Sequence, residues 1–365
     1  MSARKAVVAM SGGVDSSVAA ATLVEAGYEV TGIMLKLWKG EAANTDSGCC
    51  NVGAAEDARR VADTLGIPFY VLNLAERFEE TVIKDFHQSY ASGRTPNPCV
   101  RCNQWIKFDA LFDRAMALGA DILATGHYAR VEHREGLFRM LRGHDVRKDQ
   151  SYVLWMMSQH QLARTAFPVG EHDKAETRRI ARELGLRTAA KPDSQEICFV
   201  KSGDFDAYVD DHMAAATRPG PIVDQDGRLL GEHRGIGRYT VGQRKGLGIS
   251  LGVPVYVTGL DADANVVVVG SRDHLAVSEL SLEEVSFIGE TPGSGSRVLV
   301  QHRAHGEAAA ASFHPRGPGL AQLIYNDPVE AVAPGQSAAL YEASAPEELI
   351  GGGIISATAA AAAVA

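Results

Sequence analysis

The feature that most constrains the fold is an alternation of short apolar stretches with longer helical ones between Ala6 and Gly185. Runs of β-branched and other apolar residues predict buried strands at Ala6–Met10, Glu29–Leu37, Pro68–Leu72 and Ile122–Thr125. Helical periodicity, with a glycine directly after the C-terminal end of each segment, predicts helices at Asp15–Ala26, Ala54–Leu65, Phe108–Leu118 and Arg178–Leu184. Strands that alternate with helices form right-handed βαβ crossovers, so we expect an α/β domain with a doubly wound parallel sheet.

The amino-acid composition changes after about residue 205, where Gly, Pro and Asp become frequent. Short strands are predicted at Arg238–Val241, Val253–Gly259, Val266–Gly270, Arg297–His302, Gly319–Tyr325 and Ser337–Glu342. This pattern indicates a small linking domain and then a C-terminal antiparallel β-barrel. We place the domains at 1–204, 205–275 and 276–355, and expect the alanine-rich tail 356–365 to be disordered or a frayed helix.

A glycine-rich loop, Ser11-Gly12-Gly13-Val14-Asp15-Ser16-Ser17, lies between the first predicted strand and the first predicted helix. The two glycines allow a tight turn whose amides, with nearby hydroxyls and a helix N-terminus, can bind an oxyanion. The loop lacks the lysine of a Walker A motif. Asp15 cannot attract phosphate itself, but it could hold a Mg²⁺ ion that bridges phosphate oxygens. The alternative is an ordinary strand-to-helix turn in which Asp15 or Ser16 caps the helix.

The five cysteines, Cys49, Cys50, Cys99, Cys102 and Cys198, bear on compartment and chemistry. The N-terminus runs straight into a strand without the features of a signal peptide, and no apolar run approaches the roughly 18–20 residues of a membrane span. We therefore expect a cytoplasmic protein that makes no membrane contact. In that compartment cysteines serve metal binding, redox work or catalysis more often than structural disulfides.

Cys102 and Cys198 lie in the segments that most resemble reactive sites. One segment is proline-rich, Thr95–Asn103, and the other is polar, Lys191–Phe199. Arg101, Lys107 and Lys191 could lower a thiol pKa there, although inert packing is the alternative for any single cysteine. Cys99 and Cys102 have the spacing of half a zinc site, but no second pair matches it. An iron–sulfur cluster on Cys99, Cys102 and Cys198 stays open as the less favoured alternative.

The charge balance limits what kind of nucleic-acid binding is expected. A net charge of -9 argues against indiscriminate binding, because a phosphate backbone must be met by local positive charge. Basic residues do cluster locally, either as a solvated face or as an RNA-binding surface: Arg142, Arg147, Lys148, and Arg234, Arg238, Arg244, Lys245.

The motifs together resemble the tRNA-specific 2-thiouridylase (MnmA) family of the PP-loop ATP pyrophosphatase superfamily, along nearly the whole chain. The matching strings are Met10–Ser17, Cys49-Cys50 with Glu56–Arg59, Thr95–Pro98 with Cys102-Asn103, Thr125–Arg130, Lys148–Tyr152, Asp193–Cys198, Tyr239–Ile249 and Pro334–Gln336. The resemblance implies that ATP adenylates O2 of the wobble uridine of tRNA and that a Cys198 persulfide delivers sulfur to C2. Cys102 then either attacks the persulfide or releases sulfide from it, leaving a Cys102–Cys198 disulfide to be reduced.

The resemblance also implies roles for individual positions. Catalysis would rest on Cys102, Cys198 and Asp15, with Asp15 as the tentative magnesium ligand. ATP would be held by Ala9, Met10, Ser11, Gly12, Gly13, Val14, Asp15 and Ser16, with Leu35 and Gly126 beside the adenine. Asn97, Pro98 and Cys99 would lie near the target base. The tRNA would contact His127, Lys148, Asp149, Gln150 and Gln336, with Arg303 and His305 as weaker candidates.

One position departs from the family pattern, and two rival functions stay open. Family members often have Asp where this chain has Cys99, so Cys99 could be a spectator, a resolving thiol or a cluster ligand. The expected partners are tRNA and a persulfide sulfur donor or sulfur-carrier protein, and the protein is expected to be monomeric. The rivals are another PP-loop enzyme, such as a tRNA lysidine synthetase, and a metal-binding RNA-interaction module without catalysis.

Overall fold

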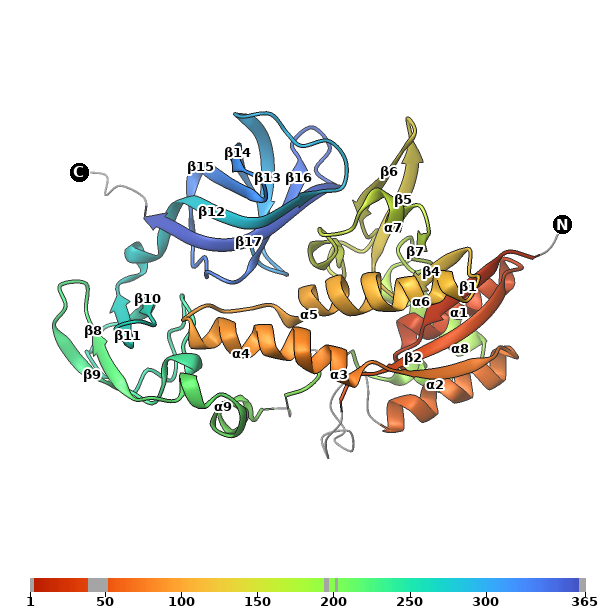
Figure 1. Ribbon diagram of the computed structural model, residues 1–365, viewed down its shortest axis with the longest axis horizontal. Helices are drawn as coiled ribbons and strands as arrows, with labels where there is room; N and C mark the ends of the chain where they lie inside the picture. Colours follow the sequence, from red (N-terminus) through yellow and green to blue (C-terminus); the bar gives the residue numbers. More distant parts are fainter. Residues whose placement is uncertain (1–2, 39–51, 194–196, 201–202, 361–365) are drawn as a thin grey trace.

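The computed structural model describes residues 3–38, 52–193, 197–200 and 203–360. Cys49 and Cys50 lie outside the described residues. The first part of the chain forms a parallel sheet in the order β3-β2-β1-β4-β7 (Figure 1). Its strands are β1 (Lys5–Ala9), β2 (Glu29–Lys36), β3 (Phe69–Asn73), β4 (Ile122–Thr125) and β7 (Thr165–Ala166). The predicted parallel sheet is confirmed, and β1 lies at its centre.

Helices cover both faces of this sheet, which confirms the doubly wound arrangement. Alternate strand residues face opposite sides, so Val7 and Val8 belong to two different apolar clusters. One cluster takes in α1 (Val14–Glu25), α2 (Val52–Leu65) and α8 (Lys174–Glu183). The other takes in α3 (Ala75–Phe78), α4 (Lys84–Ala91), α5 (Pro98–Arg101) and α6 (Phe112–Ala117), with π-helical turns at Glu79–Ile83 and Cys102–Leu111; α7 (Gln159–Leu162) follows.

The central part is a small sheet in the order β10-β11-β8-β9, preceded by α9 (Phe205–His212). The strands are β8 (Gly220–Val223), β9 (Leu229–His233), β10 (Tyr256–Asp261) and β11 (Val266–Gly270). The predicted strand at Arg238–Val241 is wrong, because Ile236–Arg238 forms a 3₁₀ turn. Gly235 turns the chain there with φ +115°, and a Cβ on it would lie 2.5 Å from the Ala216 carbonyl oxygen. Packing against that carbonyl, rather than local β propensity, sets the conformation.

The C-terminal part is a closed antiparallel barrel, as predicted. Its strands follow the order β12-β15-β14-β13-β16-β17, and pairing of β12 with β17 closes it. They are β12 (Ala276–Phe287), β13 (Ser296–Gln301), β14 (Ala309–Gly317), β15 (Leu320–Glu330), β16 (Ser337–Glu342) and β17 (Glu348–Ala360). The tail prediction is wrong for residues 356–360, since Ala360 pairs with Val277 in the closing strand. Closure satisfies backbone groups that an open edge would expose, and this outweighs the poor β propensity of alanine.

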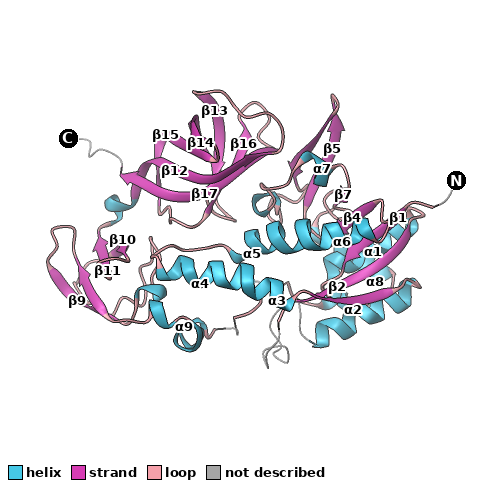
Figure 2. Ribbon diagram, in the orientation of Figure 1, coloured by secondary structure: helices cyan, strands magenta, loops and turns pink. Residues whose placement is uncertain are grey.

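The barrel is joined to the first part of the chain by a continuous sheet. The hairpin β5 (Ala129–Arg134) and β6 (Leu137–Arg142) pairs with β17 through Leu349 and Met140. Figures 1 and 2 show the barrel lying alongside α4 and α5, on the side of the helices away from α9. Within the described residues, no helix is both long enough and apolar enough to cross a membrane.

Candidate functional site

The glycine-rich loop joins β1 to α1 at the carboxyl edge of the parallel sheet. Gly12 has φ +71°, and a Cβ on it would lie 2.2 Å from the Ala54 carbonyl oxygen, so only glycine fits. Ser16 Oγ accepts a hydrogen bond from the Ser11 amide at 3.1 Å, and Ser17 Oγ donates to the Gly13 carbonyl at 2.8 Å. Gly13 is the N-cap of α1, and no side chain caps this helix. The capping alternative for Asp15 or Ser16 is therefore wrong, and the positive helix end is open to an anion.

The other predicted ATP positions gather around this loop. Gly126 follows β4, and a Cβ there would lie 2.5 Å from the Ser16 amide nitrogen, so two loops meet at van der Waals contact. Met10 is buried, and its amide donates to the Ile33 carbonyl at 2.8 Å. Leu35, in β2, is 8% exposed and belongs to the apolar cluster that also contains Cys102. The fold thus brings the loop, Leu35 and Gly126 to one edge of the sheet.

Asp15 is held by a lysine that sequence reasoning did not single out. Lys174 Nζ lies 2.7 Å from Asp15 Oδ1 and 2.9 Å from Oδ2, and the Tyr128 hydroxyl donates to Oδ1 at 2.9 Å. Burial, together with the Asp15 charge, raises the pKa of Tyr128, so its proton stays in place. No group of three His, Cys, Asp or Glu side chains within the described ranges is arranged to hold a metal ion. Both Asp15 oxygens are engaged by Lys174 and Tyr128, and the role of Asp15 as a magnesium ligand stays a prediction.

A second carboxylate, Asp193, shares the same lysine. Asp193 lies 2.8 Å from Lys174, 2.7 Å from Lys148 and 3.1 Å from Arg178. Burial raises the pKa of Asp193, but hydrogen bonds from Lys148 and Lys174 and their charges outweigh it and lower the pKa to about 2. Asp15 and Asp193 are therefore tied together through one ammonium group.

Lys191 ties the chain that leads to Cys198 directly to the glycine-rich loop. Its Nζ lies 3.0 Å from the Gly12 carbonyl oxygen and 2.9 Å from Asp57 Oδ2. Arg178, on α8, donates to the Ala189 and Lys191 carbonyls at 2.7 and 2.9 Å. Four cationic side chains form ion pairs with three carboxylates at this edge of the sheet. The cations are Lys148, Lys174, Arg178 and Lys191, and the carboxylates are Asp15, Asp57 and Asp193, so the edge carries a net positive charge suited to phosphates.

The three described cysteines differ in accessibility. Cys99 is exposed, Cys102 is 8% exposed and Cys198 is half-buried. Cys102 opens the π-helical turn Cys102–Leu111, a rare conformation that is frequent at functional sites. Cys198 packs against the same apolar cluster to which Cys102 belongs. The fold therefore gathers both predicted thiols on one side of the parallel sheet.

The residues before Cys102, which we call the Cys102 segment (Arg94–Cys102), form a capped helical turn. Asn97 is the N-cap of α5 and accepts from the Cys99 amide at 3.1 Å, with Pro98 in the first turn. The predicted role of Arg101 and Lys191 in lowering a thiol pKa is not supported by their contacts. Arg101 pairs with Glu284 at 2.6 Å, and Lys191 pairs with Asp57, so neighbouring carboxylates balance both charges.

Several residues predicted to contact tRNA have partners within the chain. His127 is 8% exposed with Nδ1 2.7 Å from Thr125 Oγ1, and burial and the Lys107 charge hold its pKa well below the usual value. The Asp149 side chain is 4% exposed and binds Arg142 at 2.7 Å. Both side chains are therefore buried and bound within the protein, and little of their surface is accessible to RNA.

The remaining tRNA candidates are more varied. Gln150 Oε1 accepts from the Tyr128 amide at 3.0 Å, and Gln336 Nε2 donates to the Thr95 carbonyl at 2.8 Å. Arg303 and His305 are exposed on the loop after β13, where the Arg303 guanidinium also donates to the Glu330 carbonyl at the end of β15, at 3.4 Å. Gln150 is exposed as well, so accessibility favours one of the main candidates together with the two that the sequence pattern ranked lowest.

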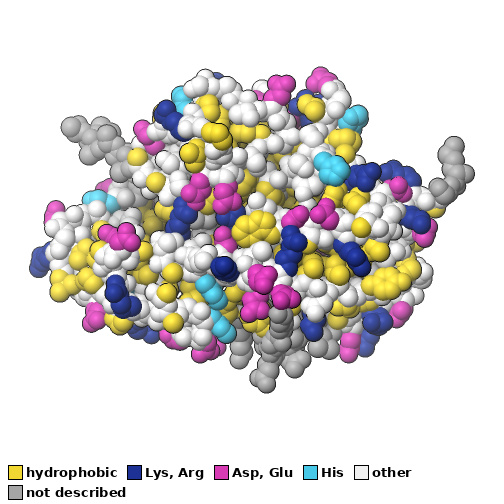
Figure 3. Space-filling view, viewed as in Figure 1, with side chains coloured by type: hydrophobic (Ala, Val, Ile, Leu, Met, Phe, Trp, Pro, Cys, Tyr) yellow, Lys and Arg dark blue, Asp and Glu magenta, His cyan; other side chains and the backbone are white. Residues whose placement is uncertain are grey.

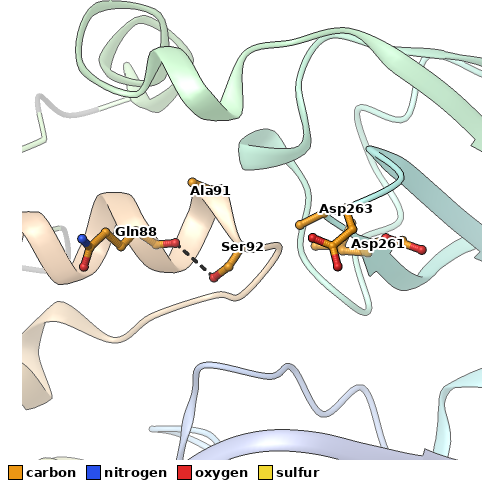
Figure 4. A pocket seen from close by; sticks show the side chains of 7 residues that line it. Gln88, Ala91, Ser92, Asp261 and Asp263 are labelled. Carbon is orange, nitrogen blue, oxygen red and sulfur yellow. Dashed lines mark hydrogen bonds between the residues drawn. The ribbon is translucent and has the colours of Figure 1, made fainter.

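An open pocket of about 730 Å³ lies elsewhere, between the end of α4 and the β10–β11 turn (Figure 4). Ser92 and Gln88 line one side, and Asp261 and Asp263 line the other. The pocket shares no residue with the glycine-rich loop or the cysteine segments, so the candidate site is defined by the polar network rather than by this hollow.

Three family models match the three parts of the chain in turn. Residues 4–202 match the family model described as the tRNA methyl transferase HUP domain, residues 206–271 the corresponding PRC-barrel domain, and residues 277–355 the aminomethyltransferase beta-barrel domain. Among solved structures, an ATP-bound 4-thiouridine synthetase–RNA complex covers 55% of this chain and 46% of its own, with 20% identity and a TM-score of 0.35, which is too distant to bear on function.

Curated relatives match over nearly their full length. The tRNA-specific 2-thiouridylase MnmA of Moorella thermoacetica is 47% identical over 355 residues, covering 96% of this chain and 98% of the relative. The protein of the same name from Magnetococcus marinus is 46% identical, covering 96% and 99%. Identity at this level over the whole length shows that the chain belongs to the tRNA-specific 2-thiouridylase MnmA family.

Proposed function

We propose that this protein uses ATP to replace the 2-oxygen of the wobble uridine of tRNA with sulfur. The proposal rests on the contact between the glycine-rich loop and the segment of the chain that leads to Cys198. Lys191 binds the Gly12 carbonyl at 3.0 Å, and Lys174 lies between Asp15 at 2.7 Å and Asp193 at 2.8 Å. A group activated at the loop would therefore arise beside a segment that carries a thiol.

The first step is adenylation. Uridine O2 attacks the α-phosphorus of ATP, and pyrophosphate leaves. The uncapped end of α1 and the ammonium groups of Lys174 and Lys148 would stabilise the charge that develops on the phosphates. Asp15 and Asp193 hold Lys174 in place before ATP arrives, so little reorganisation is needed. Adenylation turns a poor leaving oxygen into part of AMP.

The second step moves sulfur. The terminal sulfur of a Cys198 persulfide attacks C2, and AMP leaves with the former O2. The Cys102 thiolate then attacks Cys198 Sγ, breaking the bond to the transferred sulfur and leaving it on C2 as 2-thiouridine. The new Cys102–Cys198 disulfide is reduced by two electrons from a thiol reductant, and a persulfide donor reloads Cys198. The common apolar cluster of the two thiols supports this pairing.

The tRNA would approach from the side of the barrel that presents Arg303 and His305. Both side chains are exposed, unlike His127 and Asp149, so they can meet phosphates without a rearrangement of the core. Binding through such contacts should weaken steeply with salt.

The proposal is tested by mass spectrometry of nucleosides from unmodified tRNA incubated with protein, ATP, Mg²⁺, a persulfide donor and a thiol reductant. We expect 2-thiouridine at the wobble position, with one pyrophosphate released per thiolated uridine. Omission of ATP or of the donor should abolish the product. Pyrophosphate release without thiolated nucleoside, under all donor conditions, would instead indicate another PP-loop chemistry.

A further inference from the structure

The Cys102 segment is docked on the barrel at several points before it reaches the thiol. Arg94 pairs with Glu283 at 2.7 Å, and the Thr95 amide donates to the Pro334 carbonyl at 2.8 Å. On the face drawn in Figure 3, acidic and basic side chains gather along the boundary between the barrel and the helices beneath it. The segment therefore takes its position from a domain far away in the sequence.

Arg101, the residue directly before Cys102, makes the most specific of these contacts. Its guanidinium donates to both carboxylate oxygens of Glu284, at 2.6 and 2.7 Å, and lies 3.4 Å from Asp85. It also stacks over the Trp105 ring at 4.6 Å, and its side chain is only 9% exposed. Although the Glu284 side chain is 44% exposed, a two-pronged pair with a nearly buried arginine fixes both distance and orientation. The Arg101 side chain is thus held firmly, and the backbone of Cys102 follows it.

Glu284 is presented by an irregularity in β12. Glu283 pairs with Ile354 of β17, and Ser286 pairs with Gly352. Between these two pairs β12 advances by three residues and β17 by two, so β12 carries one extra residue, a β-bulge. Glu284 itself has φ +51°, a left-handed conformation that glutamate seldom adopts. A hydrogen bond from Arg101 lowers the pKa of Glu284, so this carboxylate is charged at neutral pH. A strained bulge that aims one side chain at a partner is typical of a functional constraint.

We propose that Arg101 and Glu284 are positioning residues, through which the barrel holds Cys102 in its buried, working orientation. The idea goes beyond the proposed function, since it assigns the barrel a part in the thiol chemistry besides contact with RNA. Its consequence for sulfur transfer rests on the proposed function, whereas its consequence for the accessibility of Cys102 does not.

The first test measures how fast iodoacetamide alkylates each cysteine, read by peptide mass spectrometry. In the unaltered protein, buried Cys102 should react more slowly than exposed Cys99, which serves as an internal reference. Glu284→Gln should raise the Cys102 rate about tenfold, because loss of the ionic pair allows local opening, and should leave Cys99 within about twofold. Arg101→Lys keeps the charge without the two-pronged geometry and should act in the same direction. Glu284→Asp, which keeps the carboxylate, should restore part of the protection.

The matched control is Glu347→Gln. Glu347 pairs with Arg130 at 2.8 Å, another ion pair between the barrel and the first part of the chain, but one remote in sequence from the Cys102 segment. This variant should leave the Cys102 rate unchanged. An unchanged Cys102 rate in Glu284→Gln and Arg101→Lys, with folding verified by circular dichroism, would overturn the proposal. An equal rise in Glu347→Gln would also overturn it, since it would show general loosening of the domains.

The second test separates positioning from adenylation. In Glu284→Gln, single-turnover release of pyrophosphate should match the unaltered protein, while formation of 2-thiouridine falls about 10- to 100-fold, the cost of a misplaced reacting group. Equal losses in both steps would contradict a role limited to Cys102. If the unaltered protein makes no thiouridine, the proposed function fails, and the alkylation rates still decide whether the barrel positions Cys102.

Discussion

Replacement of Asp193 by asparagine tests the charge network that joins the glycine-rich loop to the segment that leads to Cys198. Lys148 and Lys174 overcome the effect of burial and lower the pKa of Asp193 from 3.8 to about 2. Each pKa unit is worth about 1.4 kcal/mol, so the ionic form contributes at most about 2.5 kcal/mol to the free energy of unfolding. The side chain is 23% exposed, and solvent screening reduces this to about 1–2 kcal/mol.

The dependence on pH gives the prediction its direction. Because the folded-state pKa lies below the unfolded-state value, the stabilisation is complete above about pH 4 and is lost as pH falls toward 2. Urea unfolding of Asp193→Asn should therefore show a loss of about 1–2 kcal/mol at pH 7 and roughly half of that at pH 3.

The control is Asp109→Asn, which removes an exposed pair with Arg77 whose side chains are 44% and 46% exposed. Its loss should stay below about 1 kcal/mol. A loss for Asp193→Asn no larger than this control, or one that does not shrink between pH 7 and pH 3, would refute the reasoning.

Three further predictions concern the nucleotide and RNA contacts. Lys174→Gln removes the ammonium group between Asp15 and Asp193, so single-turnover pyrophosphate release should fall about 100-fold; an unchanged rate would place the phosphates elsewhere. Gly126→Ala puts a Cβ 2.5 Å from the Ser16 amide, so ATP affinity, measured by calorimetric titration, should drop about tenfold; full affinity would show that the two loops can separate at no cost. Arg303→Gln removes an exposed cation, so the slope of log affinity for tRNA against log salt should decrease by about one; an unchanged slope would exclude a phosphate contact there.

The elements set by local sequence could be predicted, and those set by distant contacts could not. The strands and helices around Gly12 and Gly13 follow from apolar periodicity and turn glycines, and the structure places them within a few residues of the predicted ranges. Lys174 was missed because neither carboxylate partner lies in its own helix, and one of them, Asp15, is 159 residues away. The only local signal was Asp173, which caps α8, whereas the helix was predicted to begin at Arg178.

The error in the tail and the missed contact of Asp15 have the same physical origin. The sequence of residues 356–360, Ser-Ala-Thr-Ala-Ala, has no strand signal of its own, yet β12 pairs with Ala357, Thr358, Ala359 and Ala360. The lysine partner of Asp15 lies 159 residues away, so no local pattern could reveal this contact. The roles assigned to Cys102 and Cys198 stay predictions, because a shared apolar cluster gives neither the distance between the two thiols nor the order of chemical events.

The central claim is that Cys198 carries the sulfur and Cys102 acts on it afterwards. The most direct measurement is intact-peptide mass spectrometry after loading with a persulfide donor, followed by tRNA and ATP without reductant. We predict a persulfide on Cys198 before turnover, a Cys102–Cys198 disulfide after it, and, in Cys102→Ser, a normal Cys198 persulfide with normal pyrophosphate release but no 2-thiouridine. A persulfide on Cys99 or Cys102, or full thiolation by Cys102→Ser, would contradict the account.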